Sequence, residues 1–427
     1  MQRTLSAELL SSSPGREAAL LRGRILRHPL GDDVTFLFED ASGRVRLAWT
    51  LSDALPVPGT IVELVVEPRA EGWGVARCEV LTPYRRDVPY PSPGGEAWRV
   101  AGGGRSRRER LRVRADVLRA IRAFFDARGY LEVQTPVRVT SPGLEPHLRA
   151  VPSDDAFLIT SPEYQLKRLL AAGIERPYFL GPCFRAEEEG PLHHGEFCML
   201  EWYEAYADLP SLMRQTEELV RAAARAANRP AAAPFRGAPL DLDRPFVRLT
   251  VREAFDRYAG IDLRGVMDAI GLRRAAEAAG HGPFPGDAHF DAVFSELLVT
   301  WVEPHLAQLG AVFLTDFPAP LAALARLCPE DPTVAERFEL YLGGVELANA
   351  FGELTDPVEQ ERRLHGDLAL RAELGAPVYP IDERFLEALR EGIPPAAGIA
   401  LGIDRLLLVL CDADRLDEVV AFAPDEL

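Results

Sequence analysis

The sequence comprises 427 residues, 47% of them hydrophobic and 26% charged, which is ordinary for a globular protein of two or three domains. No apolar run reaches the ~18 residues of a membrane span, and the N-terminus does not resemble a signal peptide, so we expect a cytoplasmic protein with no membrane partner. The net charge is −17, and this acidic balance offers no broad electrostatic surface for nucleic acid.

Residues 21–83 contain five short segments of alternating apolar and polar residues, separated by turn signals. This spacing predicts a small β-barrel of the OB kind in an N-terminal domain of residues 1–88. Its basic and aromatic residues suit either a single nucleic-acid strand or an aromatic core with solvated arginines, and we favour the second interpretation. These residues are Arg22, Arg24, Phe36, Phe38, Arg44, Arg46 and Trp49.

Residues 89–106 are rich in proline, glycine and serine, which predicts a flexible linker before a second domain at 107–427. Apolar residues at helical spacing from Leu111 to Phe125 predict a long helix that stops at Gly129 and leads into a strand. A further helix is predicted to begin near Pro162. Glu163 then lies in its first turn, where the helix dipole favours a carboxylate.

Residues 178–206 read as a strand, a polar loop and a returning strand. Alternate side chains of an extended chain share a face, so we expect Arg185 with Glu187 on one strand. On the other strand Phe197, Glu201 and Tyr203 share a face. A face that carries a cation, an aromatic ring and carboxylates predicts a ligand site.

Residues 336–351 form a second predicted hairpin, with Gly343-Gly344 as its two-residue turn. Ideal pairing places Glu339 opposite Ala348 and brings Glu339 and Glu346 to one surface. Either magnesium or arginines from elsewhere would balance these two charges, and we favour magnesium. Strict alternation leaves Asn349, Phe351 and Glu353 on the opposite side from Glu346. A bulge near Asn349 would be needed to bring Glu353 round, and the sequence gives no sign of one.

The segment 396–410 predicts a strand that runs into an apolar helix, with Arg405 in the first helical turn. Gly398 and Gly402 allow close approach of a ligand to the backbone, although helix packing also explains such glycines. An arginine at a helix start opposes the dipole, so we expect an anionic or stacking partner for Arg405.

Three of these stretches resemble the signature motifs of class II aminoacyl-tRNA synthetases. LEVQTP (131–136) is similar to motif 1, FRAEEEGPLHHGEFCMLEWY (184–203) to motif 2 and GIALGIDRL (398–406) to motif 3. Within the lysine subgroup, the resemblance from about Arg110 onward is to elongation factor P lysine or (R)-β-lysine ligases rather than to lysyl-tRNA synthetases. Ser161 and Ala400 carry this distinction, because the tRNA enzymes usually have alanine and glycine there.

The resemblance implies an ATP site in which Arg185 clamps the α-phosphate and Phe197 and Arg405 stack on the adenine. Arg185 and Arg405 would be catalytic, and Glu339 and Glu346 would bind Mg²⁺. Two further sets of residues follow from the resemblance. The ATP site also includes Glu187, as a partner of the adenine amino group, and His194, Glu346, Leu347 and Gly402. The amino acid would be bound by Ser161, Glu163, Glu201, Tyr203, Asn349 and Glu353.

The implied fold is α+β, an antiparallel sheet with flanking helices, and the implied assembly is a homodimer formed through the helix ending at Gly129. The expected reaction joins lysine or (R)-β-lysine to ATP as an aminoacyl-adenylate and transfers it to a lysine of elongation factor P. Two alternatives stay open. The chain could be a compact lysyl-tRNA synthetase acting on tRNA, or a non-catalytic synthetase-like protein that binds RNA or senses a ligand.

Overall fold

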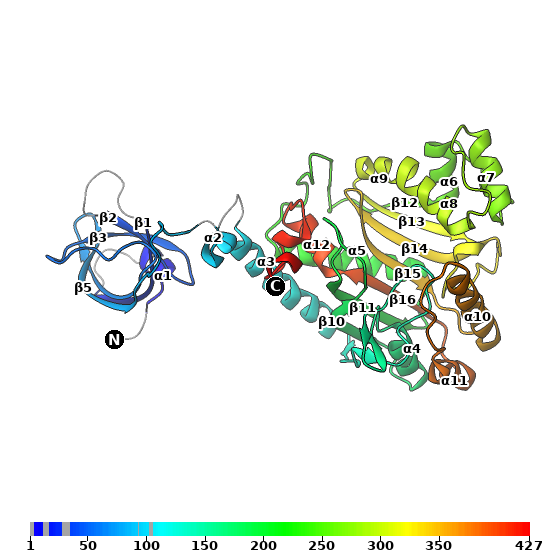
Figure 1. The fold of residues 1–427 in the computed structure, drawn as a ribbon, viewed down its shortest axis with the longest axis horizontal. Coiled ribbons are helices and arrows are strands. Elements are labelled where there is room, and N and C mark those ends of the chain that lie inside the picture. Colours follow the sequence, from blue (N-terminus) through cyan, green and yellow to red (C-terminus); the bar gives the residue numbers. More distant parts are fainter. Residues whose placement is uncertain (1–3, 12–16, 28–34, 93, 102–105) are drawn as a thin grey trace. The chain divides into compact units, whose positions relative to one another are not determined.

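The computed structural model describes residues 4–11, 17–27, 35–92, 94–101 and 106–427 (Figure 1). They form two compact units that divide between Ser106 and Arg107. Among the described helices, none is long and apolar enough to cross a membrane. Residues 102–105 of the predicted linker lie outside the described residues.

The first unit is a closed five-stranded barrel, which confirms the OB-like prediction. Its strands are hydrogen-bonded in the order β1-β2-β3-β5-β4. Phe36, Phe38 and Trp49 belong to its buried core, as the favoured interpretation expected. The elements are α1 (Ser6–Ser11), β1 (Ala19–Arg27), β2 (Thr35–Glu39), β3 (Arg44–Trp49), β4 (Ile61–Arg69), β5 (Gly72–Thr82) and α2 (Glu96–Ala101), which lies within the segment predicted as a linker.

The second unit is built on an eight-stranded, mostly antiparallel sheet with the order β12-β13-β14-β15-β16-β11-β10-β6. Its strands are β6 (Leu131–Glu132), β10 (Pro177–Phe184), β11 (Glu196–Ala205), β12 (Val247–Thr250), β13 (Ala311–Pro318), β14 (Val334–Leu342), β15 (Val345–Gly352) and β16 (Ala396–Gly402). A small sheet of β7 (Arg138–Val139), β9 (Ala156–Leu158) and β8 (Pro152–Ser153) lies between motifs 1 and 2 in the sequence.

Three helices share a hydrophobic core with one face of the large sheet: α3 (Arg107–Asp126), α5 (Leu209–Ala226) and α12 (Ile403–Leu410). On this face Leu200 and Trp202 of β11 are completely buried. Because side chains alternate along a strand, the neighbours of these two residues point to the opposite face. That opposite face is the one available for a site.

The remaining helices flank the sheet and complete the predicted α+β fold. An inserted helical segment between β12 and β13 has its own apolar core. Helix α11 packs against α4 and α10. The elements are α4 (Glu163–Ala171), α6 (Val251–Ala254), η1 (Phe255–Ala259), α7 (Ala269–Ala278), α8 (Phe290–Leu297), η2 (Leu298–Val302), α9 (Glu303–Leu309), η3 (Ala319–Leu321), α10 (Pro357–Glu373), α11 (Glu383–Glu391), η4 (Leu416–Glu418) and η5 (Pro424–Glu426).

Candidate active site

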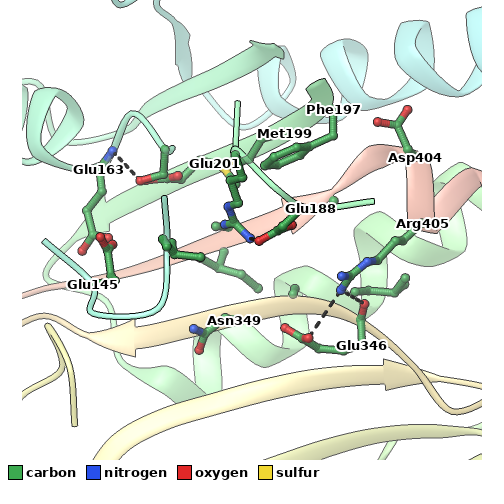
Figure 2. Close-up of a pocket in the computed structure, with 18 of the residues that line it drawn as sticks. Glu145, Glu163, Glu188, Phe197, Met199, Glu201, Glu346, Asn349, Asp404 and Arg405 are labelled. Atoms are coloured by element: carbon green, nitrogen blue, oxygen red, sulfur yellow. Dashed lines mark hydrogen bonds and ion pairs between the residues drawn. The ribbon is translucent and has the colours of Figure 1, made fainter. Parts of the chain in front are cut away.

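A cavity of about 460 Å³ lies on the face of the sheet opposite α3, α5 and α12 (Figure 2). Its walls come from segments far apart in the sequence, chiefly α4, the β10–β11 hairpin, β15, β16 and the start of α12. Of the predicted site residues, Glu187, Glu339 and Glu353 are not among the described residues that line it. Those that do are Ser161, Glu163, Arg185, His194, Phe197, Glu201, Tyr203, Glu346, Leu347, Asn349, Gly402 and Arg405.

Strand β11 supplies one wall of the cavity through its period-two alternation. Phe197, Glu201 and Tyr203 all line the cavity, as the sequence predicted. The hydroxyl of Tyr203 donates a hydrogen bond of 2.8 Å to Oε1 of Glu201. The local sequence pattern therefore placed this face correctly.

Arg185 lies just beyond the end of β10 and faces the cavity. Its guanidinium carbon is 5.0 Å from the ring centre of Phe197, and Nη1 is 3.7 Å from a carboxylate oxygen of Glu188. Its Nε atom is buried and has no hydrogen-bond partner among the described residues. Arg185 is thus a cation that has an unpaired hydrogen-bond donor and lies close to the aromatic ring of Phe197.

The prediction that Glu187 shares the face of Arg185 is wrong. Strand β10 ends at Phe184, and Glu187 has a φ of 65°, so the chain there is no longer extended. The Glu187 side chain is 67% exposed and accepts hydrogen bonds of 2.7 Å from Arg149. The next residue, Glu188, lines the cavity instead.

Arg405, in the first turn of α12, has the anionic partner that its position required. Its Nη1 atom lies 2.9 Å from the backbone oxygen of Glu346 and 3.4 Å from Oε2 of the same residue. Its Nη2 atom lies 2.6 Å from Nε2 of His193. Burial, together with the charge of Arg405, lowers the pKa of His193, which suits a neutral ring that accepts this bond. Arg405 and Arg185 line the same cavity.

The β14–β15 hairpin contains a bulge that ideal pairing did not predict. Tyr341 pairs with Glu346, but Leu340 pairs with Ala348, so Leu347 is the extra residue. Glu339 therefore lies opposite Asn349, not opposite Ala348. Facing residues share a side of the sheet, so the bulge brings Asn349 onto the side of Glu346 and Glu339.

Glu339 is only 7% exposed and lies beside the cavity rather than in its wall. It accepts hydrogen bonds from Nη2 of Arg337 at 2.7 Å and from the hydroxyl of Tyr341 at 2.9 Å. Burial raises its pKa to about 7, the charge of Glu346 adds to this rise and Arg337 opposes it. An arginine partner is therefore present, yet the repulsion between the two carboxylates remains.

Lys167, the only lysine of the chain, is buried among the carboxylates at the other end of the cavity. Its Nζ lies 2.6 Å from Oε1 of Glu163 and 2.5 Å from Oε2 of Glu353. Two of the acids predicted to bind the substrate amines thus already share an internal cation. The buried atom Oε2 of Glu201 has no hydrogen-bond partner among the described residues.

At Gly398 on β16, the space beside the backbone is filled by side chains. A Cβ atom there would lie 2.2 Å from Cε1 of Tyr203 and 2.5 Å from Oε1 of Glu353. We expect Gly398→Ala to lower the free energy of unfolding by about 1–3 kcal/mol through overpacking and to displace Tyr203.

The measurement is urea unfolding of the full chain, with Gly402→Ala as the matched control. A Cβ at Gly402 would meet nothing closer than 3.8 Å, so its effect on stability should be smaller. An equal decrease in the free energy of unfolding for the two variants would contradict this explanation of Gly398.

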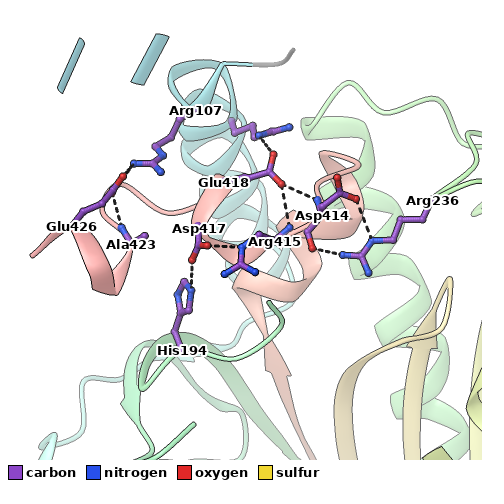
Figure 3. Close-up of polar contacts among 10 residues, drawn as sticks. Arg107, His194, Arg236, Asp414, Arg415, Asp417, Glu418, Ala423 and Glu426 are labelled. Carbon is purple, nitrogen blue, oxygen red and sulfur yellow. Dashed lines mark hydrogen bonds and ion pairs between the residues drawn. The ribbon is translucent and has the colours of Figure 1, made fainter. Parts of the chain in front are cut away.

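The C-terminal segment contributes Leu416 to the cavity lining and makes polar contacts with His194 (Figure 3). Nε2 of His194 lies 2.8 Å from Oδ1 of Asp417, whose other oxygen accepts a 2.8 Å bond from Arg415. Burial acts to raise the pKa of Asp417, but these two hydrogen bonds outweigh it and lower the pKa. Arg107 of α3 binds Glu426 at 2.6 Å, which fixes the end of the chain to the same unit.

Sequence reasoning missed four residues: Glu145, Lys167, Glu188 and Arg337. Lys167 lies four residues after Glu163 on one helix, and Arg337 lies two residues before Glu339 on one strand, so ordinary periodicity contained both signals. Glu145 and Glu188 lie outside the named helices and strands, where no period applies.

The cavity has two chemically different ends. At one end Arg185 and Arg405 lie with Phe197 and with the carboxylates that pair with them, Glu188 and Glu346, whereas the other end holds carboxylates such as Glu163 and Glu201. Such a division suits a ligand that carries phosphate or carboxylate at one end and amines at the other. Lys167 already pairs with Glu163, but a buried oxygen of Glu201 has no partner among the described residues, which favours a cationic ligand at that end.

Comparisons with known proteins identify relatives of this chain. Residues 103–426 match the family of class II tRNA synthetases (D, K and N). The elongation factor P–(R)-β-lysine ligase of Hamiltonella defensa is 39% identical over 323 residues, covering 73% of this chain and 94% of that protein. The same-named ligase of Pectobacterium carotovorum is 40% identical over 324 residues, with the same coverage.

The lysine–tRNA ligase of Moorella thermoacetica is also similar, with 40% identity over 316 residues. The alignment covers 73% of this chain but only 64% of that protein. The chain thus spans less than two thirds of the tRNA ligase and nearly all of the two protein-modifying relatives.

Proposed function

The chain belongs to the class II tRNA synthetases of the D, K and N group and to the lysine-type family of elongation factor P–(R)-β-lysine ligases within it, and we propose that it modifies elongation factor P. It activates lysine or (R)-β-lysine with ATP as an aminoacyl-adenylate. It then transfers the aminoacyl group to a lysine side chain of the factor. Because the relatives are named for translation substrates, we place this activity in the cytoplasm.

The observation that carries the proposal is one cavity that combines two arginines and an aromatic ring at one end with carboxylates at the other. In the first step, the substrate carboxylate attacks the α-phosphorus of ATP and pyrophosphate leaves. The nucleophile is already an anion, so the protein needs no general base. Arg185 stabilises the charge that develops on the α-phosphate oxygens, and Phe197 and Arg405 hold the adenine between them.

The acidic end selects the amino acid. Glu163, Glu201 and Tyr203 line the cavity, and Glu353 lies beside Gly398 together with Tyr203. A diamino acid offers these groups one ammonium group more than most amino acids do. A buried site that hydrogen-bonds a substrate amine rejects analogues that lack it, because the site's polar groups would then stay unpaired. Ser161 and Ala400 also line this end and shape it for lysine or its β-isomer.

Magnesium is the cation that this site suits best. Glu339 and Glu346 are two carboxylates on one side of a hairpin, and their mutual repulsion contributes to the raised pKa of Glu339. No group of three or more side-chain ligands occurs among the described residues, which suits Mg²⁺ because it usually takes one or two carboxylates plus substrate phosphates. The ion would neutralise charge on the phosphates of ATP.

We expect Glu346→Gln to raise the magnesium concentration needed for half-maximal ATP–pyrophosphate exchange by roughly tenfold, which corresponds to the loss of one charged ligand worth about 1.4 kcal/mol. The measurement is a magnesium titration at fixed ATP. Glu361→Gln removes a charge that pairs with Arg390 on the surface and serves as the control. An unchanged midpoint for Glu346→Gln would remove this residue from the metal site.

The acceptor is tested by incubating the full chain with ATP, the amino acid and either unmodified elongation factor P or tRNA. Intact mass of the factor reports the donor and the acceptor together. The enzyme contributes little background, because its only lysine is 1% exposed and paired with two acids. Label on tRNA alone would overturn the proposed acceptor and leave the adenylate chemistry in place.

One observation favours aminoacylation of tRNA as the second candidate function. The barrel of residues 19–82 lies outside the region that matches the family model, and barrels of the OB kind bind single strands. Against a strand-binding role, Phe36, Phe38 and Trp49 are core residues and are not available for stacking. Arg22 and Arg44 pair with Glu63 and Glu39.

We also propose that the catalytic unit acts as a homodimer through α3 and β6. Leu131 on β6 is 51% exposed, and an apolar side chain at that position suits a partner surface. Sedimentation of the wild-type chain and of Leu131→Glu tests this arrangement. The charged variant should sediment as a monomer.

A further inference from the structure

We propose that Glu145 is a specificity-determining residue that accepts a hydrogen bond from the substrate amine nearest the reacting carboxylate. This inference rests on the proposed function and deepens it. Glu145 precedes motif 2 by some forty residues and was not among the predicted site residues. It lines the same cavity as Glu163 and Arg185, and Figure 2 shows the carboxylate groups of Glu145 and Glu163 close to each other.

The backbone around Glu145 is held in place by buried contacts. Arg371, which is completely buried, donates hydrogen bonds to the backbone oxygens of Glu145 at 2.6 Å and of Leu148 at 3.0 Å. Gly143 has a φ of 112°, and a Cβ atom there would lie 2.6 Å from Oε2 of Glu145. A glycine at this position therefore leaves room for the carboxylate of Glu145.

One carboxylate oxygen of Glu145 lacks a partner. This atom, Oε2, is buried and has no hydrogen-bond partner among the described residues. Burial raises the pKa of Glu145, and the charge of Glu163 raises it further, against weaker opposing effects of a hydrogen bond from its own backbone and of the charges of Arg185 and Arg371. Lys167 does not neutralise the charge of Glu145, because its ammonium group is paired with Glu163 and Glu353.

The cavity thus contains two acids with an unpartnered buried oxygen, Glu201 and Glu145. A diamino acid brings two ammonium groups, so each can meet one of these two carboxylates. Glu145 lines the cavity together with Arg185, which belongs to the phosphate end, and its carboxylate lies beside that of Glu163. Glu201 already accepts a hydrogen bond from the hydroxyl of Tyr203. Glu145 therefore suits the amine that distinguishes lysine and (R)-β-lysine from a simple ω-amino acid.

The first test is Glu145→Gln in ATP–pyrophosphate exchange with L-lysine and with (R)-β-lysine. We expect the KM for the better of the two amino acids to rise about 10- to 100-fold, the usual range for a hydrogen bond to a charged group. The KM for ATP should stay within about twofold, since the nucleotide does not meet this carboxylate. An unchanged KM for the amino acid would overturn the inference.

A second readout separates recognition from general structure. The Ki of 6-aminohexanoate, which lacks the amine in question, should be the same within about threefold in the wild type and in Glu145→Gln. If Glu145→Gln weakened the binding of 6-aminohexanoate as much as that of the diamino acid, the inference would be overturned, because the variant would then have general damage to the cavity. Asp367→Asn is the matched control, since the charge of Glu145 raises the pKa of Asp367 but Asp367 does not line the cavity. Its KM for the amino acid should change less than about threefold.

Glu145→Gln removes a buried, uncompensated charge, so we expect the variant to fold at least as stably as the wild type. Glu145→Asp keeps the charge but shortens the side chain by one methylene, and it serves if Glu145→Gln does not fold. It should change the ratio of kcat/KM for L-lysine and (R)-β-lysine, and an unchanged ratio with an unchanged KM would overturn the inference. If the wild type shows no ATP–pyrophosphate exchange with any diamino acid, the proposed function and this inference are overturned together. If the wild type is active and the variant has the same KM for the amino acid, the inference alone is overturned.

Discussion

Replacing Arg185 with alanine is expected to lower kcat/KM for ATP–pyrophosphate exchange by about 10²- to 10³-fold, the usual cost of losing one donor aimed at developing charge. Arg185 ends within the cavity, next to Phe197 and Glu188, and its buried Nε has no partner among the described residues. A buried donor without a partner suits an anion bound in the cavity. The loss should appear in kcat as well as in KM, because charge on the α-phosphate grows in the transition state.

The measurement is exchange of labelled pyrophosphate into ATP at saturating and at low amino acid concentration. Arg362→Ala is the control, because Arg362 is an exposed arginine that pairs with Glu359 on α10. A loss of less than about tenfold in Arg185→Ala would show that Arg185 does not clamp the reacting phosphate. Arg405 would then be the next candidate for that role.

Replacing Lys167 with methionine is expected to lower the free energy of unfolding at pH 8 by about 3–5 kcal/mol, the cost of breaking a buried ion pair from one side. The side chain is 1% exposed and pairs with Glu163 and Glu353. Methionine fills a similar volume but leaves both acids without a cation. Burial lowers the pKa of Lys167, and the two carboxylates more than offset this, so the pKa is raised and the ammonium stays charged.

The destabilisation should depend on pH in a defined direction. Burial raises the pKa of Glu353 to about 7, against the opposing charge of Lys167. A carboxyl group with a raised folded-state pKa contributes stability that is present below its unfolded value, near 4.5, and is lost as pH rises through about 7. Without Lys167 this pKa rises further, so Lys167→Met should cost less at pH 5 than at pH 8.

Urea unfolding of the full chain at both pH values measures this difference. The double variant Lys167→Met/Glu353→Gln should recover part of the stability at pH 8, because it removes one of the unpaired acids. A cost below about 1 kcal/mol at pH 8, the range of an exposed pair, would contradict the buried-pair explanation. So would equal costs at the two pH values.

The amino-acid sequence by itself was sufficient wherever local periodicity decides the structure. Period-two alternation placed Phe197, Glu201 and Tyr203 on one face of β11, and the Gly343-Gly344 turn fixed the start of the β14–β15 hairpin. Helical spacing placed Glu163 in the first turn of α4 and Arg405 in the first turn of α12. The order of the three motifs was enough to indicate the family.

Only the tertiary structure showed where the chain departs from the ideal geometry of strands and hairpins. The positive φ of Glu187 turned it to solvent and brought Glu188 to the cavity, and the bulge at Leu347 brought Asn349 to the side of Glu346. Neither deviation leaves a periodic signal. Lys167 meets Glu353 across 186 positions of sequence, and Glu145 comes from an irregular segment fixed by Arg371. Periodicity reports the preferences of near neighbours along the chain, whereas these contacts depend on which distant segments pack together.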